Sequence, residues 1–545
     1  MRFISVAFCT LSVLCATTLA QSNAIPFVNL ALSPTSVAPG SQAFTLTVTG
    51  TGFAPTAVLK WNRSPRLTIV ISSTELRATI NASDVAKART ASVTVTNPPP
   101  GGGTSNVVFF PIRVPSLAVA MTGKQVFSGA TVTAVGDFNN DGKLDVVWYG
   151  NGLLNVSFGN GNGTFQTPIS TTVSSFQVDQ LITGDFNGDG KLDVVAIESA
   201  GSSWMAQIYL GNGNGTLTQS GAISTSSGGG ASNFVVTADF NQDGYSDLYL
   251  TASNLGSQWF SIPLGKGDGT FSYGWGYLEQ WVGGYGRAAV GDFNGDGKLD
   301  IAAPNWSTTE IFLGDGDGNF QNPHTTFGGN DPYLFTADMN HDGKLDLILD
   351  NCIALGNGDG TFSFAGCGAY SGQTAAVGDF NGDGNLDVAV TGAILLGAGD
   401  GTFLNSFRIN GGGAGEVGDF NNDGMLDMIS PNGVLLLQTT AGLSTTSLVF
   451  GNQNVGTKSS PQTATLTNVG ASALVINGIS IVGTGYANFK QTNNCGLSLA
   501  AGTSCTINVT FNPKAVGTFS PSVNVSYKGV GSPQKVALSG TGVAP

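Results

Sequence analysis

The sequence predicts an all-β protein in which a seven-bladed β-propeller lies between two smaller β-sandwich domains. Glycine accounts for 79 of the 545 residues and charged residues for only 10%, which is typical of chains built from short strands and turns. Alternating apolar and polar runs lie near both ends of the chain. Between them a nine-residue motif recurs seven times, beginning at Asp137, Asp185, Asp239, Asp292, Asp338, Asp379 and Asp419.

The repeated motif has the pattern of a cation-binding loop. Every copy keeps Asp, Asn, Asp, Gly and Asp at positions one, three, five, six and nine, as in Asp292 to Asp300. Oxygen side chains at alternate positions of a tight turn point to one centre, and the carbonyl of position seven can join them. This oxygen donor set favours calcium over zinc or copper. Ordinary turns also prefer Asp, Asn and Gly, but a turn does not need Asp at position nine, so we expect up to seven Ca²⁺ ions.

The spacing of the motifs predicts one propeller blade per repeat. Motif starts lie 40 to 54 residues apart, a period typical of blades or solenoid units. In the fourth repeat the expected strands are 288–291, 299–302, 311–313 and one at Phe320, with a second turn at 314–318. Four antiparallel strands make one blade.

Ring closure is predicted from the seventh repeat. Its second turn is missing after Leu437, so this blade lacks a fourth strand of its own. The segment from Ser116 to Met121 lies at the spacing before Asp137 that fourth strands occupy before later loops. A ring closed with that segment has no exposed strand edges.

Residues 113–438 resemble FG-GAP/VCBS repeats, the calcium-loop propellers of integrin α-subunit heads and of many secreted bacterial proteins. The resemblance implies that each loop binds calcium through the side chains of positions one, three, five and nine and the carbonyl of position seven. These residues are Asp137, Asn139, Asp141, Lys143, Asp145, Asp185, Asn187, Asp189, Lys191, Asp193, Asp239, Asn241, Asp243, Tyr245, Asp247, Asp292, Asn294, Asp296, Lys298, Asp300, Asp338, Asn340, Asp342, Lys344, Asp346, Asp379, Asn381, Asp383, Asn385, Asp387, Asp419, Asn421, Asp423, Met425 and Asp427.

The flanking domains resemble two classes of immunoglobulin-like sandwich. Residues 26–112 resemble the TIG/IPT class through the runs 33–40 and 48–53. Residues 443–545 resemble ASH/hydin-like domains through 467–470, 511–513 and the closing run 538–542. In secreted bacterial proteins such modules usually serve as spacers or adhesion modules.

The start of the chain predicts a secreted protein, and the net charge limits its partners. Residues 1–20 combine Arg2, a mostly apolar run and a small-residue end at Ala20, as a secretory signal peptide does. No later stretch approaches the roughly 20 apolar residues of a membrane-spanning helix. The net charge of −14 argues against nucleic acid or anionic membrane as a partner.

The four cysteines that remain after signal cleavage form two local pairs. Cys352 and Cys367 are placed to face each other across a hairpin, and Cys495 and Cys505 bracket a short loop. Both pairs are expected to be disulfides, as in an oxidising compartment. The alternative, a soft metal site, lacks the further Cys or His ligands that it would need.

The sequence offers little material for catalysis. His324 and His341 are the only histidines, which leaves almost nothing for Ser-His-Asp or His-metal chemistry. A carboxylate pair could come from Glu198, Glu279, Glu310 and Asp331, although scattered surface acids are the commoner explanation. We therefore expect a binding protein rather than an enzyme. A structural surface module without a ligand and a polysaccharide-active hydrolase or lyase are the alternatives.

The expected ligand face is the one opposite the cation loops. The connections between second and third strands, and between blades, lie there and vary most in length. Exposed rings would suit a glycan or a protein partner, whereas packing between blades is the competing explanation. The aromatic residues in these connections are Trp204, Trp259, Trp275, Tyr277, Trp281, Tyr285 and Trp306. Removing calcium is expected to destabilise the propeller and to affect the flanking sandwiches little.

Overall fold

The computed structural model describes residues 22–116, 118–173, 177–200, 203–224, 234–254, 257–273, 286–305, 308–321, 324–328, 333–370, 372–409, 415–445, 447–470, 472–529 and 531–545. Within these ranges the chain is all-β, and the only helices are two short 3₁₀ turns, η1 (Ala82–Val85) and η2 (Tyr486–Asn488). None of the described helices is long and apolar enough to cross a membrane.

The N-terminal domain is a β-sandwich, as predicted. Its first sheet has the order β1 (Phe27–Val28), β2 (Phe44–Thr51), β6 (Glu75–Ile80), β5 (Thr68–Val70). Its second sheet has the order β4 (Ser64–Pro65), β3 (Val58–Trp61), β7 (Arg89–Asn97), β8 (Gly103–Thr104), with β9 (Val108–Ile112) also paired to β7. Alternate residues of these strands face inwards, and Leu46, Trp61 and Phe110 are completely buried between the sheets.

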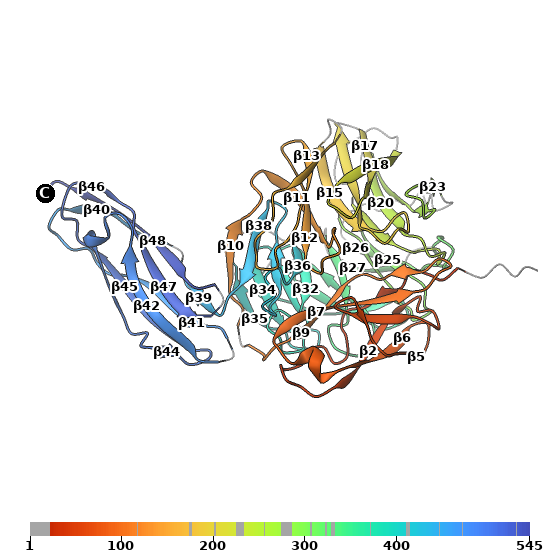
Figure 1. The fold of residues 1–545 in the computed structure, drawn as a ribbon, viewed down its shortest axis with the longest axis horizontal. Helices are drawn as coiled ribbons and strands as arrows, with labels where there is room; N and C mark the ends of the chain where they lie inside the picture. Colours follow the sequence, from red (N-terminus) through yellow and green to blue (C-terminus); the bar gives the residue numbers. More distant parts are fainter. Residues whose placement is uncertain are drawn as a thin grey trace, which may run out of the picture.

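The central domain is a β-propeller (Figure 1). Its described strands form seven blades. Blade one contains β11 (Ala130–Gly136), β12 (Asp145–Gly150), β13 (Leu153–Ser157) and β14 (Ile169–Thr172). Blade two contains β15 (Gln177–Gly184), β16 (Asp193–Ala200), β17 (Ser203–Gly211) and β18 (Leu217–Ser224). Blade three contains β19 (Val235–Ala238), β20 (Asp247–Asn254), β21 (Ser257–Ser261), β22 (Pro263–Gly265) and β23 (Phe271–Tyr273).

The other blades repeat the same antiparallel order. Blade four contains β24 (Ala289–Gly291), β25 (Asp300–Asn305), β26 (Thr308–Phe312) and β27 (His324–Gly328). Blade five contains β28 (Leu334–Ala337), β29 (Asp346–Leu349), β30 (Cys352–Gly356) and β31 (Phe362–Cys367). Blade six contains β32 (Thr374–Gly378), β33 (Asp387–Val390), β34 (Ala393–Gly397) and β35 (Phe403–Arg408). Blade seven contains β36 (Glu416–Gly418), β37 (Asp427–Ile429), β38 (Val434–Gln438) and β10 (Met121–Gln125).

The ring is closed by an N-terminal strand, as predicted. Strand β10 pairs antiparallel with β38, with Met121 opposite Gln438, and β36 of blade seven lies against β11 of blade one. The closing strand begins where the predicted segment 116–121 ends. The reason is that Ser116 is held elsewhere, because its backbone N–H donates to Asn381 O of blade six at 2.8 Å.

The propeller core lies between neighbouring blades. Each apolar cluster joins two adjacent sheets, and the last one joins blade seven to blade one through Leu435, Phe420 and Trp148. Position two of each repeated loop is an apolar side chain that enters these clusters. These residues are Phe138, Phe186, Phe240, Phe293, Met339, Phe380 and Phe420, all buried.

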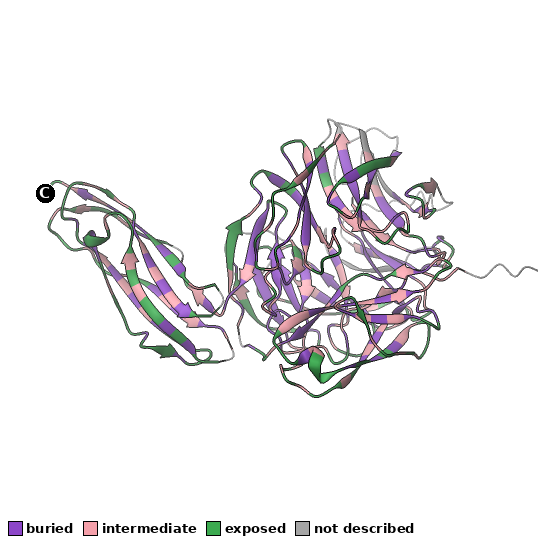
Figure 2. Ribbon diagram, in the orientation of Figure 1, coloured by how far each residue is buried: buried purple, intermediate pink, exposed green. Residues whose placement is uncertain are grey.

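The C-terminal domain is a second β-sandwich that extends away from the propeller (Figure 1). One sheet has the order β39 (Ala441–Leu443), β41 (Gln462–Asn468), β45 (Ser504–Phe511), β43 (Phe489–Asn493). The other has the order β40 (Ser447–Asn454), β48 (Gln534–Val543), β47 (Ser522–Lys528), β42 (Leu474–Val482), β44 (Ser498–Leu499), with β46 (Gly517–Phe519) on β48. Buried and more exposed residues alternate along these strands (Figure 2). The domain begins at Ala441, two residues before the predicted boundary of 443.

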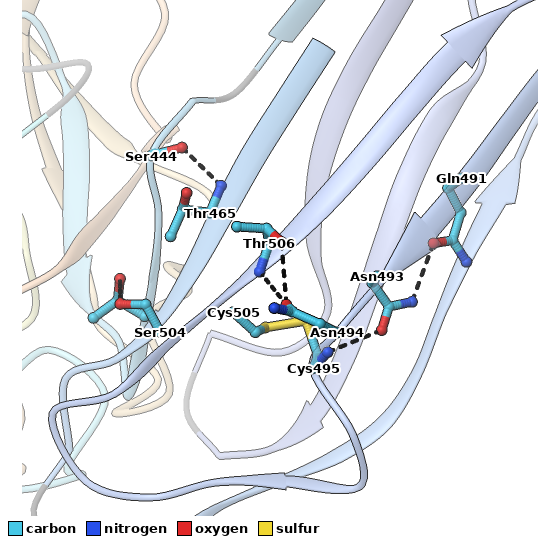
Figure 3. Close-up of a disulfide and its surroundings, with 10 residues drawn as sticks. Ser444, Thr465, Gln491, Asn493, Asn494, Cys495, Ser504, Cys505 and Thr506 are labelled. Carbon is cyan, nitrogen blue, oxygen red and sulfur yellow. Dashed lines mark hydrogen bonds between the residues drawn. A yellow bond between two sulfur atoms is a disulfide. The ribbon is translucent and has the colours of Figure 1, made fainter. Parts of the chain in front are cut away.

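Both predicted disulfides are present. Cys352 and Cys367 are directly opposite each other on β30 and β31 and are bonded. Cys495 and Cys505 are bonded in the C-terminal sandwich. Figure 3 shows two side chains that hold this loop by hydrogen bonds. Asn494 Oδ1 accepts a hydrogen bond from the Thr506 N–H at 2.7 Å, and Asn493 Oδ1 accepts one from the Cys495 N–H at 3.2 Å.

Candidate metal centres

The seven loops share one set of hydrogen bonds. In loop one the N–H groups of Asp141 and Gly142 donate to Asp137 Oδ1 (3.1 Å) and Oδ2 (2.7 Å). The Asp141 N–H also donates to Asn139 Oδ1 (2.9 Å), and the Lys143 N–H donates to Asp141 Oδ1 (2.9 Å). The same bonds recur in the other six loops. The chain thus holds the oxygen atoms of positions one, three and five within a single turn.

The Asp at position nine has a structural role that the sequence analysis missed. Asp145 Oδ2 accepts the Phe138 N–H at 2.9 Å, and its Oδ1 accepts the Gly159 N–H at 2.8 Å. Each loop repeats both bonds, with the Gln438 N–H replacing the glycine N–H in loop seven. All seven side chains are completely buried. Position nine therefore ties the start of the loop to the end of the third strand, and its remaining lone pairs are still available to a cation.

The loops concentrate negative charge where water is scarce. The pKa of the Asp145 carboxyl is raised to about 7, mainly by burial and also by the nearby carboxylates of Asp137 and Asp141, against the opposing effect of the Gly159 and Phe138 N–H groups. The same causes raise the pKa of Asp247 to about 8. A bound cation would offset both the burial and the repulsion.

The residues present fit a hard cation with mixed oxygen ligands. Among the described residues, no three or more acidic, His or Cys side chains form a ready-made metal-binding group. The candidate ligand set therefore depends on the Asn amide oxygen and the position-seven carbonyl as well as on carboxylates, which is a combination that Ca²⁺ accepts. In loop seven Asp423 Oδ2 is buried and has no hydrogen-bond partner. A cation would satisfy this atom.

The N-terminal sandwich lies on the loop-bearing face of the propeller, which the sequence analysis did not predict. The Ile25 N–H donates to Asp239 Oδ2 of loop three at 2.7 Å, and the Thr90 N–H donates to Asp419 Oδ2 of loop seven at 3.4 Å. These donors bond to carboxylates that belong to the candidate metal centres themselves. The sandwich also contacts three further loops. Arg63 forms an ion pair with Asp137 of loop one, Leu30 O accepts a hydrogen bond from the Asp338 N–H of loop five, and the Ser36 hydroxyl donates to Gly382 O of loop six.

The burial of the position-one carboxylate divides the loops into two groups. The position-one carboxylates of loops three, six and seven, Asp239, Asp379 and Asp419, are 4%, 4% and 8% exposed. A methyl group added at the position-six glycine of each of these loops would clash with the sandwich. At Gly244 it would strike Asn23 O, at Gly384 it would lie 2.7 Å from Thr35 Oγ1, and at Gly424 it would lie 2.6 Å from Arg89 N. We call these three the covered loops. Loops one, two, four and five are the open loops.

The open loops differ at the same positions. Among the described residues, no atom lies within 4 Å of a methyl group added at Gly142, Gly190 or Gly343. The corresponding methyl at Gly297 of loop four would lie 3.6 Å from Thr74, an ordinary contact. The position-six side is therefore open at loops one, two and five, whereas at loop four the sandwich lies in contact with it but leaves room for the added methyl.

A cavity of about 190 Å³ lies beside loop seven, between the propeller, the C-terminal sandwich and the entry linker, which is the segment that joins β9 to β10. Its lining includes Arg113 and Ser116 from the entry linker, Asp423 from the loop, Gln438 and Val469. Arg113 Nη1 donates to Phe380 O at 3.0 Å and fixes the entry linker to loop six. Burial lowers the pKa of Arg113, while Asp379 and Asp423 raise it.

The aromatic residues proposed to bind a ligand fall largely outside the described part of the structure. Trp275, Tyr277, Trp281, Tyr285 and Trp306 all lie outside the described residues. Trp204 belongs to β17, where it pairs with Ser199, and Trp259 belongs to β21, where it pairs with Ala252. The hairpins of blades two and three are long, since β16 and β20 each have eight residues and β33 has four. The length difference expected from the sequence is therefore present.

The two described candidate catalytic residues, Glu198 and Glu310, lie in different blades. Glu198 is completely buried within blade two, where it accepts the Tyr209 hydroxyl at 2.7 Å. Glu310 lies on β26, whereas Glu279 and Asp331 lie outside the described residues. His341 occupies position four of loop five, 3.4 Å from Asn385 of loop six. His324 begins β27.

Comparisons with known proteins identify two of the three domain types. The family described as FG-GAP-like repeat matches residues 137–196, 185–250 and 292–349. The family described as HYDIN/CFA65/VesB-like, Ig-like domain matches residues 442–541. The chain therefore contains FG-GAP-like repeats and a HYDIN/VesB-like immunoglobulin-like domain. No curated protein matches the chain.

Several solved structures are similar to parts of the chain. A lectin of Agrocybe aegerita, described as recognising non-reducing terminal N-acetylglucosamine, is 20% identical over 65% of this chain and 95% of its own, with a TM-score of 0.40. The ASH/PapD-like domain 7 of human CEP192 is 17% identical over 19% of this chain and 87% of its own, with a TM-score of 0.16. An auxiliary nutrient binding protein of Bacteroides ovatus is 10% identical over 76% of this chain and 98% of its own, with a TM-score of 0.29. None of these similarities assigns a ligand to this chain.

Proposed function

We propose that this protein is an extracellular calcium-binding propeller that recognises a glycan or a protein partner through the face opposite its cation loops. The observation that carries the proposal is the recurrence of one hydrogen-bonded, oxygen-rich loop in all seven blades. The Asp at position nine has a structural role of its own, but positions one and five also keep a carboxylate in every loop, and this repetition suits a shared cation requirement.

Calcium would act as part of the fold. Positions one, three, five and nine and the carbonyl of position seven would hold the ion, which supplies positive charge between three mutually repelling carboxylates. The buried Asp at position nine links each loop to the third strand of its blade. Binding free energy at the loop therefore contributes to the folding free energy of the blade.

The arrangement of domains supports the opposite face as the ligand site. The N-terminal sandwich occupies much of the loop face, so a large partner has less access there. The extended hairpins of blades two and three lie at the other end of the strands. Their neighbouring connections contain the aromatic residues that suit stacking on sugar rings or a protein hot spot.

The full-length protein should be tested on a glycan array and on an array of extracellular matrix proteins, each with calcium and with EDTA. Binding that EDTA abolishes is the expected result. Trp275→Ala and Trp281→Ala should abolish binding and leave calcium content and melting temperature nearly unchanged. Tyr486→Ala is the matched control, because Tyr486 is 59% exposed on the C-terminal sandwich.

Each other outcome contradicts a separate part of the proposal. Binding that persists in EDTA would remove calcium from the recognition step. A large drop in melting temperature for both Trp variants would show that these rings are core residues. No binding on either array would leave the structural surface module as the better interpretation.

A further inference from the structure

The N-terminal sandwich bonds to the same oxygen atoms that shape the covered loops. Asp239 Oδ2 accepts both the Gly244 N–H of its own loop, at 2.9 Å, and the Ile25 N–H of the sandwich, at 2.7 Å. Asp419 Oδ2 does the same for Gly424, at 3.0 Å, and Thr90, at 3.4 Å. The hydrogen bonds that hold the sandwich therefore depend on the folded shape of these loops.

The sandwich packs closely against position six of each covered loop. The chain of the sandwich lies so close to Gly244, Gly384 and Gly424 that it would strike a single added methyl group. Apolar side chains strengthen this contact, since Phe27 packs against the core of blades three and four and Leu30 against that of blades five and six. A covered loop whose carboxylates move apart would push the sandwich away.

Covering a loop removes water from its carboxylates. Asp239 is only 4% exposed beneath the sandwich. Buried carboxylates without a compensating cation oppose docking. A divalent cation in the loop removes this penalty, so cation binding and docking should favour each other.

We propose that the N-terminal sandwich is a cation-dependent cap that docks on the propeller when loops three, six and seven are loaded and retains their ions while it is docked. The inference rests on the proposed calcium binding. By linkage, the cap raises the affinity of the covered loops by the same factor by which their ions favour docking. The chain then holds two kinetic classes of calcium, four ions in open loops that exchange directly and three in covered loops that exchange only when the cap lifts.

An exchange experiment tests the two classes. The full-length protein is loaded with ⁴⁵Ca²⁺ and chased with excess unlabelled Ca²⁺. The expected release has a fast and a slow phase in a ratio of four to three. A single phase from a protein that binds seven ions would overturn the cap and leave calcium binding intact, whereas absence of bound calcium would overturn the proposed function itself.

A pair of glutamate variants tests the cap directly. The Thr35 hydroxyl lies against Gly384 of loop six, so Thr35→Glu adds a negative charge beside that acidic loop. We expect its slow phase to accelerate by about ten-fold, equivalent to about 1.4 kcal/mol, with the same total calcium at saturation. Thr45→Glu is the control, because Thr45 is exposed on β2. Equal slow-phase rates of calcium release from the two variants would contradict the proposal.

Hydrogen exchange on the unmodified chain gives an independent measurement. With calcium the amides of Ile25 and Thr90 should be protected, because each donates to a loop carboxylate. With EDTA both should lose protection, while the amide of Ile507 in the C-terminal core keeps it. Unchanged protection of Ile25 and Thr90 in EDTA would show that docking does not depend on the cation.

Discussion

The guanidinium of Arg63 lies 2.5 Å from the carboxylate of Asp137, the first residue of loop one. The same Nη2 atom donates to Asn140 Oδ1 at 3.0 Å. Arg63 occupies the tight turn between β3 and β4, where both Asn62 and Arg63 have positive φ. Loop one is thus an open loop with a protein cation beside its proposed metal centre.

Arg63→Ala should strengthen calcium binding at loop one. The positive guanidinium repels an incoming cation, and its removal should lower the dissociation constant of that site several-fold. The exposed ion pair itself contributes at most about 1 kcal/mol to stability, so the melting temperature should change little. Calorimetric titration of the full-length protein measures the affinity.

Arg77→Ala is the matched control for this substitution. Arg77 pairs with Glu75 on the exposed face of the same sandwich, 2.9 Å apart. The Arg77→Ala substitution should leave the calcium affinity of loop one unchanged. Weaker binding by Arg63→Ala would instead mean that the arginine orients Asp137 for the ion.

Asp145→Asn and Asp141→Asn should separate the two roles of loop carboxylates. In the Asp145→Asn variant the new amide would present its NH₂ group to one of two backbone donors, and a buried unsatisfied donor costs about 1–3 kcal/mol. This variant should therefore be less stable even in EDTA, whereas the side chain of Asp141 is 31% exposed and its loss should reduce calcium affinity alone. Denaturant titration in EDTA makes the comparison. Equal stability of the two variants would refute the structural role of position nine.

Without calcium the propeller should be more stable in mild acid than in mild base. A carboxyl whose pKa is raised on folding destabilises the folded state once the pH exceeds the unfolded value of about 3.9, and the penalty grows until the folded pKa is reached. The pKa values of about 7 for Asp300 and about 8 for Asp247 place this loss between about pH 4 and pH 8. In EDTA the melting temperature should fall by several degrees from about pH 5 to pH 8.

Saturating calcium should reverse this pH dependence, because protons then compete with the ion for the same carboxylates. Thermal scans at matched ionic strength measure both series. The same slope with and without calcium would show that the loop carboxylates do not bind it.

The two disulfides should each stabilise only the domain that contains them. Cys352→Ser with Cys367→Ser removes a link between β30 and β31 of blade five, whereas Cys495→Ser with Cys505→Ser removes a link within the core of the C-terminal sandwich. Each loss should be about 2–4 kcal/mol, confined to its own domain. Calorimetry that resolves the domains, together with a thiol assay that finds no free cysteine before reduction, tests this expectation.

The repeats made the propeller predictable because each blade is a local unit. The order of strands around Asp292 and the closure by a strand near Met121 follow from spacing and from the need to satisfy strand edges. Cys352 and Cys367 could be paired because a hairpin of known centre fixes which residues are opposite. These predictions succeeded because they depend only on local hydrogen bonding and on strand register.

The position of the N-terminal sandwich could not be predicted, because its contacts join residues far apart in the sequence. Thr90 and Asp419 are 329 residues apart, and Thr90 donates through its backbone, which no side-chain pattern reveals. The structural role of position nine could not be predicted either, because both of its hydrogen-bond partners are backbone N–H groups, which a side-chain pattern does not reveal. We therefore keep the expectation of little response to chelation only for the C-terminal sandwich.

The pairing of β10 with β38 also determines how the molecule would carry a mechanical load. Met121 lies opposite Gln438, and the Thr439 N–H donates to Ala120 O, so the chain enters and leaves the propeller at the same end of this strand pair. A force applied between Ala120 and Thr439 would separate the two strands one hydrogen bond at a time, starting from that end. Blade seven would yield first under a load applied at these two points, whereas a load from the N-terminal sandwich would reach blade six first, because Arg113 and Ser116 bond the entry linker to that blade.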